Sequence, residues 1–175
     1  MTIQSGTHEV GPDNGSLKIK TGKEGAAAKA GHNLVLVVNS WSGTVDVEGG
    51  SGELTADPGS VEVESGEGGA KPLSDKDKAD IKKSIGSKVL GSQQITFESS
   101  SVEDNGGQIV AKGDLSIAGK SSTVSVPLSA SGGKLSGSVS LNQDDFGIKQ
   151  FSAMMGALKV GKQVEVLLEG EVPTS

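Results

Sequence analysis

Short alternations of apolar and polar residues recur along the chain. The segments Val61–Val63, Val124–Val126 and Val164–Val166 each place one polar residue between two valines. In a strand, successive side chains point to opposite faces. An alternation of apolar and polar residues therefore gives one apolar face and one face that meets water. This pattern predicts strands at residues 16–20, 33–40, 43–49, 52–56, 60–65, 94–103, 108–117, 122–130, 134–142 and 162–172.

Turn residues separate the predicted strands. Asp57-Pro58-Gly59, Asn105-Gly106-Gly107 and Gly132-Gly133 stand between alternating segments, and glycine and asparagine tolerate the positive φ of tight hairpins. Consecutive strands joined by hairpins favour an antiparallel meander. A length of 175 residues fits one domain over residues 1–175, in which we expect residues 1–14 to form a loose N-terminal segment.

One segment has the period of a helix. Ser74 is a suitable N-cap, acidic residues follow in the first turn, and Ile81, Ile85 and Val89 then recur at every fourth position. The spacing predicts an amphipathic helix of about three turns that lies on the sheet.

A second, shorter segment carries Phe151, Met154, Met155 and Leu158 at helical spacing. We expect a short turn of helix here. Its apolar side chains either fill the core or form an adaptable wall against a flexible ligand, because methionine packs against many shapes.

Small residues interrupt the apolar face of several predicted strands. Ala111 and Gly113 alternate with Ile109 and Leu115, and the chain has 1 Trp, 3 Phe and no Tyr. A sheet of about eight strands that closes on itself is either filled by its inward side chains or holds one ligand. We therefore predict an apolar lumen that the inward side chains leave unfilled.

Composition and charge exclude several classes of partner and chemistry. The net charge is −6, and all 16 basic residues are lysines. An acidic surface repels nucleic acid, and few aromatic rings are present to stack on bases, so we expect no nucleic-acid partner. The absence of cysteine excludes disulfides, thiolate metal ligands and thiol nucleophiles.

Targeting signals are not evident in this sequence. The first residues lack the basic and apolar regions of a signal peptide, and no apolar stretch approaches the ~18 residues of a membrane span. We expect no integral membrane segment and a cytoplasmic location.

Candidate chemical motifs have structural explanations. Gly119-Lys120-Ser121 resembles the end of a phosphate-binding loop, but Asp114 stands where the first glycine belongs, and a hairpin turn explains the segment better. The acids after Ser74 lack the spacing of a calcium loop, because Gly86 occupies the twelfth position. We expect no metal and no cofactor.

Catalytic groups are equally scarce. His8 and His32 are the two histidines, and no Gly-x-Ser-x-Gly motif occurs. We expect no catalytic residue and no enzymatic activity. An isomerase or hydrolase that uses the lumen with His32 is the remaining enzymatic hypothesis.

Several segments together resemble actinobacterial members of the YceI-like, lipocalin-like family. They are Gly31–Leu34, Trp41–Val45, Gly69–Lys78, Ile95–Ser99, Gly113–Gly119, Asp145–Lys149 and Leu158–Val166, in the order of the family. The resemblance implies an all-β fold: an antiparallel, lipocalin-like extended β-barrel of about eight main strands, with one or two short helices near one end. It also implies a long apolar tunnel that binds polyisoprenoids or other long-chain amphiphiles.

The sequence and the resemblance together predict a non-enzymatic carrier or storage protein for a long-chain isoprenoid or other lipid ligand held in the lumen. The expected ligand-binding residues are Leu36, Val38, Phe97, Ile109, Ala111, Leu115, Val126, Leu128, Val139, Phe146, Phe151, Met154, Met155, Leu158 and Leu168, with His32, Lys149 and Lys159 as candidates for a polar head group. The alternative hypothesis is a filled barrel that serves as a stress-related or protein-interaction module without a ligand and forms a homodimer through an exposed edge strand.

Overall fold

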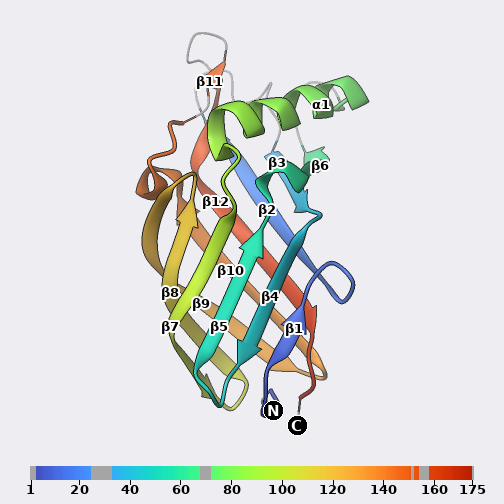
Figure 1. Ribbon diagram of the computed structural model, residues 1–175. Coiled ribbons are helices and arrows are strands. Elements are labelled where there is room, and N and C mark those ends of the chain that lie inside the picture. Colours follow the sequence, from blue (N-terminus) through green and yellow to red (C-terminus); the bar gives the residue numbers. More distant parts are fainter. Residues whose placement is uncertain (1–2, 25–32, 68–71, 151, 154–157, 175) are drawn as a thin grey trace.

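A single antiparallel sheet forms most of the protein, and a helix lies across one of its ends (Figure 1). The computed structural model describes residues 3–24, 33–67, 72–150, 152–153 and 158–174. The strands are β1 (His8–Val10), β2 (Gly15–Glu24), β3 (Asn33–Val38), β4 (Trp41–Asp46), β5 (Ser51–Ala56), β6 (Val61–Glu67), β7 (Ile95–Asn105), β8 (Gln108–Ile117), β9 (Lys120–Ser131), β10 (Lys134–Asn142), β11 (Ser152–Ala153) and β12 (Leu158–Glu171). The predicted all-β antiparallel class is confirmed, with 12 strands among the described residues in place of about eight.

The sheet is curled. Its hydrogen-bonded strands lie in the order β1-β4-β5-β7-β8-β9-β10-β12-β2-β3-β6, with β11 beside β12. The long strands β7 to β10 follow one another as hairpins, as the turn residues predict. The turn between β8 and β9 has left-handed backbone at Ala118 (φ 52°) and Gly119 (φ 81°). The segment Gly119-Lys120-Ser121 is therefore a tight hairpin turn, as expected from its sequence.

A bent two-stranded ribbon joins the two ends of this strand order. One arm of the ribbon is β3 followed by β4, and the other is β5 followed by β6; β3 pairs with β6 and β4 with β5. Both arms bend together at residues 39–40 and 57–60, where Asn39 N donates to Ser60 O (3.2 Å) and Asp57 N donates to Ser40 O (3.0 Å). Because β3 pairs with β2 while β5 pairs with β7, the ribbon closes the curled sheet into a barrel.

Helix α1 (Asp75–Ser84) continues as one further helical turn, η3 (Ile85–Leu90), across the end of the barrel opposite to both chain termini (Figure 1). The predicted N-cap is confirmed: Ser74 Oγ accepts from Asp77 N (3.1 Å), and Asp77 Oδ2 accepts from Ser74 N (3.0 Å). This reciprocal pair satisfies two backbone N–H groups at the helix start. The acids after Ser74 thus cap and begin the helix.

The end of the barrel near the termini is closed by packed side chains. Ile109, Ala130, Leu135 and Val172 are each at most 4% exposed there. The described part of the N-terminal segment, which we expected to be loose, belongs to this floor: β1 pairs with β4, and Ile3 pairs with Thr174. The pattern did not reveal β1 because His8-Glu9-Val10 contains a single apolar residue.

The segment expected to form a second short helix is extended where it is described. Ser152 and Ala153 form β11 and pair with Lys159 and Leu158 at the start of β12. The helix prediction is wrong for these residues. Phe151, Met154 and Met155 lie outside the described residues.

We predict that Ser74→Ala lowers the free energy of unfolding by about 1 kcal/mol, because the N–H of Asp77 loses its acceptor. Ser74→Asp keeps an acceptor at this position and should remain within a few tenths of a kcal/mol of the parent protein. Urea denaturation followed by circular dichroism measures both changes. Equal stability of Ser74→Ala and the parent would contradict the role of this cap.

Candidate functional site: an apolar cavity inside the barrel

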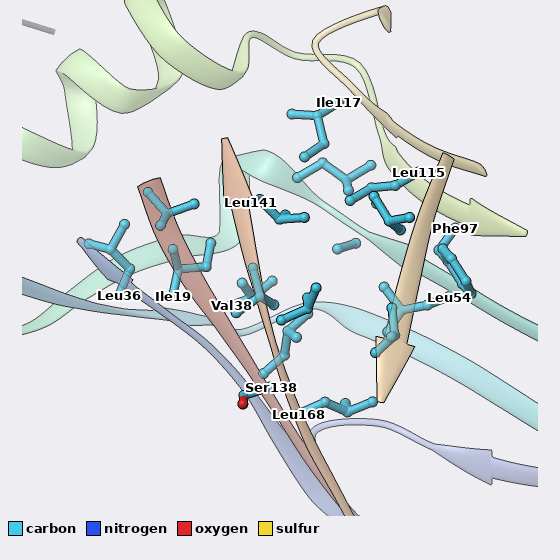
Figure 2. A pocket seen from close by; sticks show the side chains of 18 of the residues that line it. Ile19, Leu36, Val38, Leu54, Phe97, Leu115, Ile117, Ser138, Leu141 and Leu168 are labelled. Carbon is cyan, nitrogen blue, oxygen red and sulfur yellow. The ribbon is translucent and has the colours of Figure 1, made fainter. Parts of the chain in front are cut away.

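The curled sheet encloses a cavity of about 430 Å³ between the floor and the helix. Side chains from β2, β3, β5, β7, β8, β10 and β12 converge on it, as Figure 2 shows for Ile19, Leu36, Leu54, Phe97 and Leu168. The second half of α1 and η3 supply its roof through Ile81, Ile85 and Val89, which sequence reasoning placed on the helix but not in the site. Those residues form the apolar stripe that the helical spacing predicts.

Inward-facing side chains along the middle of the wall keep part of their surface exposed. Leu115 and Val126 face inward in β8 and β9, and Val139 and Val166 do so in β10 and β12, yet all are half-buried. The floor residues, in contrast, are almost completely covered. Because these middle side chains line the cavity, part of their exposed surface is the surface of the lumen. The interior is packed at one end and unfilled above it.

Glycines in the wall do not produce this space, which corrects our interpretation of the small residues. A Cβ on Gly113 would lie 2.2 Å from Glu98 O, beside the β-bulge at Ser99–Ser101 in β7. At Gly137 a Cβ would lie 2.4 Å from a methyl carbon of Leu128, and at Gly170 it would lie 2.6 Å from Val10 Cγ1. Backbone and neighbouring side chains occupy the room that these glycines leave. The lumen exists because the wall around it is lined mostly by valine and leucine.

The part of the seam between β9 and β10 that lies farther from their turn is held by side chains and not by a ladder of backbone hydrogen bonds. β9 and β10 pair only from Leu128↔Gly137 to the turn that joins them. Pro127, which has no N–H to donate, stands where the pairing stops. The 3₁₀ turn η4 (Gln143–Phe146) follows β10, and Phe146 and Ile148 pack between the two strands against Val124 and Val139.

Polar contacts attach this turn to β12. Gln143 Nε2 donates to Gly161 O (2.9 Å), Lys162 pairs with Asp144 (3.1 Å), and Gln150 Nε2 donates to Val160 O (2.9 Å). β12 bulges between Val160 and Val164, which leaves the carbonyl of Gly161 available to accept from Gln143. The turn therefore closes the seam as an anchored wedge.

Comparison with known proteins identifies the family of this fold. The model of the YceI-like domain matches residues 13–172. The chain belongs to the YceI-like family. Among solved structures, BcnA of Burkholderia cenocepacia has 19% sequence identity and a TM-score of 0.56, over 88% of this chain and 96% of that one.

Two further structures have the same fold. The YceI protein of Campylobacter jejuni shares 13% identity with a TM-score of 0.58, and a mutant of that protein shares 12% with a TM-score of 0.60; both cover 80% of this chain and 84% of their own. At these identities the likeness concerns the fold alone. No curated protein matches the sequence.

Ten predicted ligand-binding residues line the cavity of this YceI-like barrel. They are Leu36, Val38, Phe97, Ala111, Leu115, Val126, Leu128, Val139, Phe146 and Leu168. Ile109 does not line it; its side chain is 1% exposed and packed in the floor. Phe151, Met154, Met155 and the side chain of Leu158 lie outside the described part of the chain. The alternation of apolar and polar residues identified the inward-facing side chains. It could not show which of them line the cavity and which pack in the floor.

The candidate head-group residues are not brought to the cavity where the structure describes them. Lys149 is exposed on the chain segment after η4 and does not line the lumen. His32 and the side chain of Lys159 lie outside the described residues. Within the described ranges, no lysine or histidine lines the cavity, and the two acids at its border, Glu53 and Asp80, are exposed.

The polar side chains of the lining were missed by sequence reasoning; the uncharged ones are Thr21, Thr44, Ser84, Ser138 and Gln143. Gln143 is 8% exposed, and among the described residues it is the one buried polar side chain. Thr21 is half-buried, and its Oγ1 accepts from Leu34 N (3.2 Å). The alternation contained the signal: Gln143 continues the inward phase of Val139 and Leu141. Thr21 continues that of Leu17 and Ile19 in the same way.

The YceI-like barrel thus offers a largely apolar, partly enclosed space. Among the described residues no group of three or more histidines or acids could hold a metal ion. In the same part of the chain, no helix is long and apolar enough to cross a bilayer. The chemistry that this geometry supports is burial of apolar surface.

We predict that Gly113→Ala destabilises the barrel by about 1–3 kcal/mol, because the new methyl group would overlap the backbone of Glu98 and Ser99. Gly22→Ala in strand β2 of the same sheet is the matched control, since nothing lies within 4 Å of the added Cβ. Its stability should stay constant or rise by about 0.4–1 kcal/mol. Thermal and urea unfolding compare them, and equal stabilities would show that close backbone approach does not explain Gly113.

Proposed function

We propose that this protein binds a long apolar, lipid-like molecule in its lumen and acts as a carrier or store for it. The single observation that carries the proposal is the set of inward valines and leucines that remain half-exposed around an enclosed space. Apolar surface facing an empty or hydrated cavity is unfavourable, and a hydrocarbon guest would remove it from water. Membership of the YceI-like family supports the same use of the barrel.

The size of the cavity bears on the length of the guest. A volume of about 430 Å³ corresponds to roughly 14 groups the size of a water molecule, at ~30 Å³ each. A methylene is of similar size, so a chain of about 12 to 16 carbons would fill it. We propose a polyisoprenoid or a related amphiphile. In that case about three isoprene units fill the lumen.

Energy favours such a complex if enough surface is buried. Burial yields about 2.5 kcal/mol per 100 Å² of apolar surface, and association costs about 4–15 kcal/mol. Several hundred Å² of guest surface therefore suffices for stable binding. A chain that fills the lumen buries an area of this order.

We propose no catalytic step. Proton transfer to or from a ligand needs a titratable group within hydrogen-bond reach. In the described residues, the lining is mostly apolar, its uncharged polar side chains do not titrate near neutral pH, and its two acids, Glu53 and Asp80, are exposed at the border. The cytoplasmic location expected from the sequence also belongs to this proposal.

The competing hypothesis is a filled barrel without a ligand that dimerises through an edge strand. The cavity favours the first proposal, because a filled barrel would show the middle of the wall as tightly covered as the floor. The edges are available for the second: β1 and β6 end the strand order. The mass of the native protein distinguishes the two hypotheses.

We expect native mass spectrometry of the protein, purified without detergent, to show an added mass of lipid size. Delipidated protein should take up a long-chain prenol or fatty alcohol in a ratio of one to one, because there is one lumen per chain. If the protein from several expression hosts has only the mass of the polypeptide, and if the delipidated protein takes up neither compound, the proposed function is rejected. A dimer mass without adducts would support the alternative.

We further predict that Val126→Phe reduces uptake at least tenfold, because the added ring occupies the lumen that Val126 lines. Val110→Phe is the control: Val110 is 42% exposed on the outer face of the adjacent strand, where the same volume is added to solvent. Titration with a fluorescent fatty alcohol measures both, with circular dichroism as the check on folding. Equal affinities would place the ligand outside this cavity.

A further inference from the structure

We infer that Gln143 and Thr21 form a polar subsite that selects an uncharged, hydroxyl-bearing head group and orients the bound chain. This inference rests on the proposed lipid-binding function and adds to it the chemistry of the head. It starts from Gln143, which among the described residues is the one polar side chain of the largely apolar lining that is buried.

The side-chain hydrogen bond of Gln143 determines which atom of its amide is already paired. The oxygen of Gly161 can only accept, so the amide nitrogen of Gln143 must be the atom that contacts it, at 2.9 Å. The amide oxygen then points elsewhere, and no donor among the described residues reaches it. Among the described residues, the side-chain oxygen that is fully enclosed and unpaired is Asp104 Oδ2, not that of Gln143. The amide oxygen of Gln143 therefore retains surface, and Gln143 lines the cavity.

Thr21 supplies the complementary group on the same stretch of wall. It lies directly opposite Val164 in the β2–β12 pairing, and Gly161, which holds Gln143, precedes Val164 by three residues in the same bulge. The Oγ1 of Thr21 accepts from Leu34 N, and its hydroxyl hydrogen remains able to donate. The wall thus presents one acceptor and one donor near the bulge of β12.

This pair matches an alcohol, because a hydroxyl group donates one hydrogen bond and accepts another. A carboxylate or phosphate could only accept, and it would bring a charge to a place where no described cation lines the cavity. The head would lie at the bulge, near the helix-covered end. The tail would run toward Leu17 and Leu168 above the floor.

The test compares three twelve-carbon probes: dodecan-1-ol, dodecane and sodium dodecanoate, each displacing the neutral dye N-phenyl-naphthylamine from the full chain. Gln143→Met keeps the shape of the side chain and removes its amide. We expect it to weaken dodecanol binding about three- to tenfold, the loss of one or two net hydrogen bonds, and to leave dodecane within twofold. Dodecanoate should bind the parent protein at least tenfold more weakly than dodecanol.

Gln150→Met is the matched control, because Gln150 makes the same kind of bond to the neighbouring carbonyl of Val160 but does not line the cavity. It should change neither affinity. Thr21→Val is a second, independent variant. We expect it to weaken dodecanol binding in the same way and to leave dodecane binding within twofold. If Gln143→Met does not fold, Thr21→Val tests the subsite alone.

The outcomes separate the two proposals. Binding of dodecane by the parent reports the lipid-binding function, whereas the ratio of dodecanol to dodecane affinity reports the subsite. If dodecane binds and the two variants leave that ratio unchanged, or weaken both probes equally, the subsite is rejected and the function stands. If none of the three probes binds, both proposals fail.

Discussion

The hydrogen bonding of the backbone sets the girth of this barrel, and the side chains that point inward are too small to fill it. A curled sheet must pair its strands at a fixed spacing, so its circumference follows from the number of strands and their tilt. Below the middle of the wall, Ile109, Leu135 and the N-terminal residues Ile3 and Val10 belong to one packed, buried cluster. Above that level, valines and leucines line the wall without meeting. The cavity is the volume that remains.

Closure of the sheet depends on a bend and not on a further strand pair. The ribbon of β3–β4 and β5–β6 crosses from one end of the strand order to the other, and its corner is packed by Val38, Trp41, Ala56 and Val61. The single tryptophan of the chain, Trp41, is buried at this corner, opposite Ala56. The lumen can thus remain apolar and partly empty because the corner, the floor and the helix supply the packing that stabilises the fold.

Much of the wall could be predicted from the sequence, because its signal is local. The strands at 108–117 and 134–142 have the predicted bounds, and the Ser74 cap begins the helix as expected. The errors came from effects that are not local. Gly113 suggested open space, but the backbone of β7 fills its place. Gln143 sits among residues typical of a solvated turn, and only the wedge that follows β10 shows that it is buried.

The unpaired upper part of β9 and β10 has a mechanical consequence. Between strands that are paired over their length, such as β7, β8 and β9, enlarging the barrel would require the rupture of ladder hydrogen bonds, which resist cooperatively. At this seam, an increase in diameter needs only that Phe146 and Ile148 shift against Val124 and Val139, since no interstrand amide bond joins the edges. The wall is therefore more compliant along this line than between strands that are paired over their length, so guests of different thickness can be accommodated while the paired strands keep their spacing.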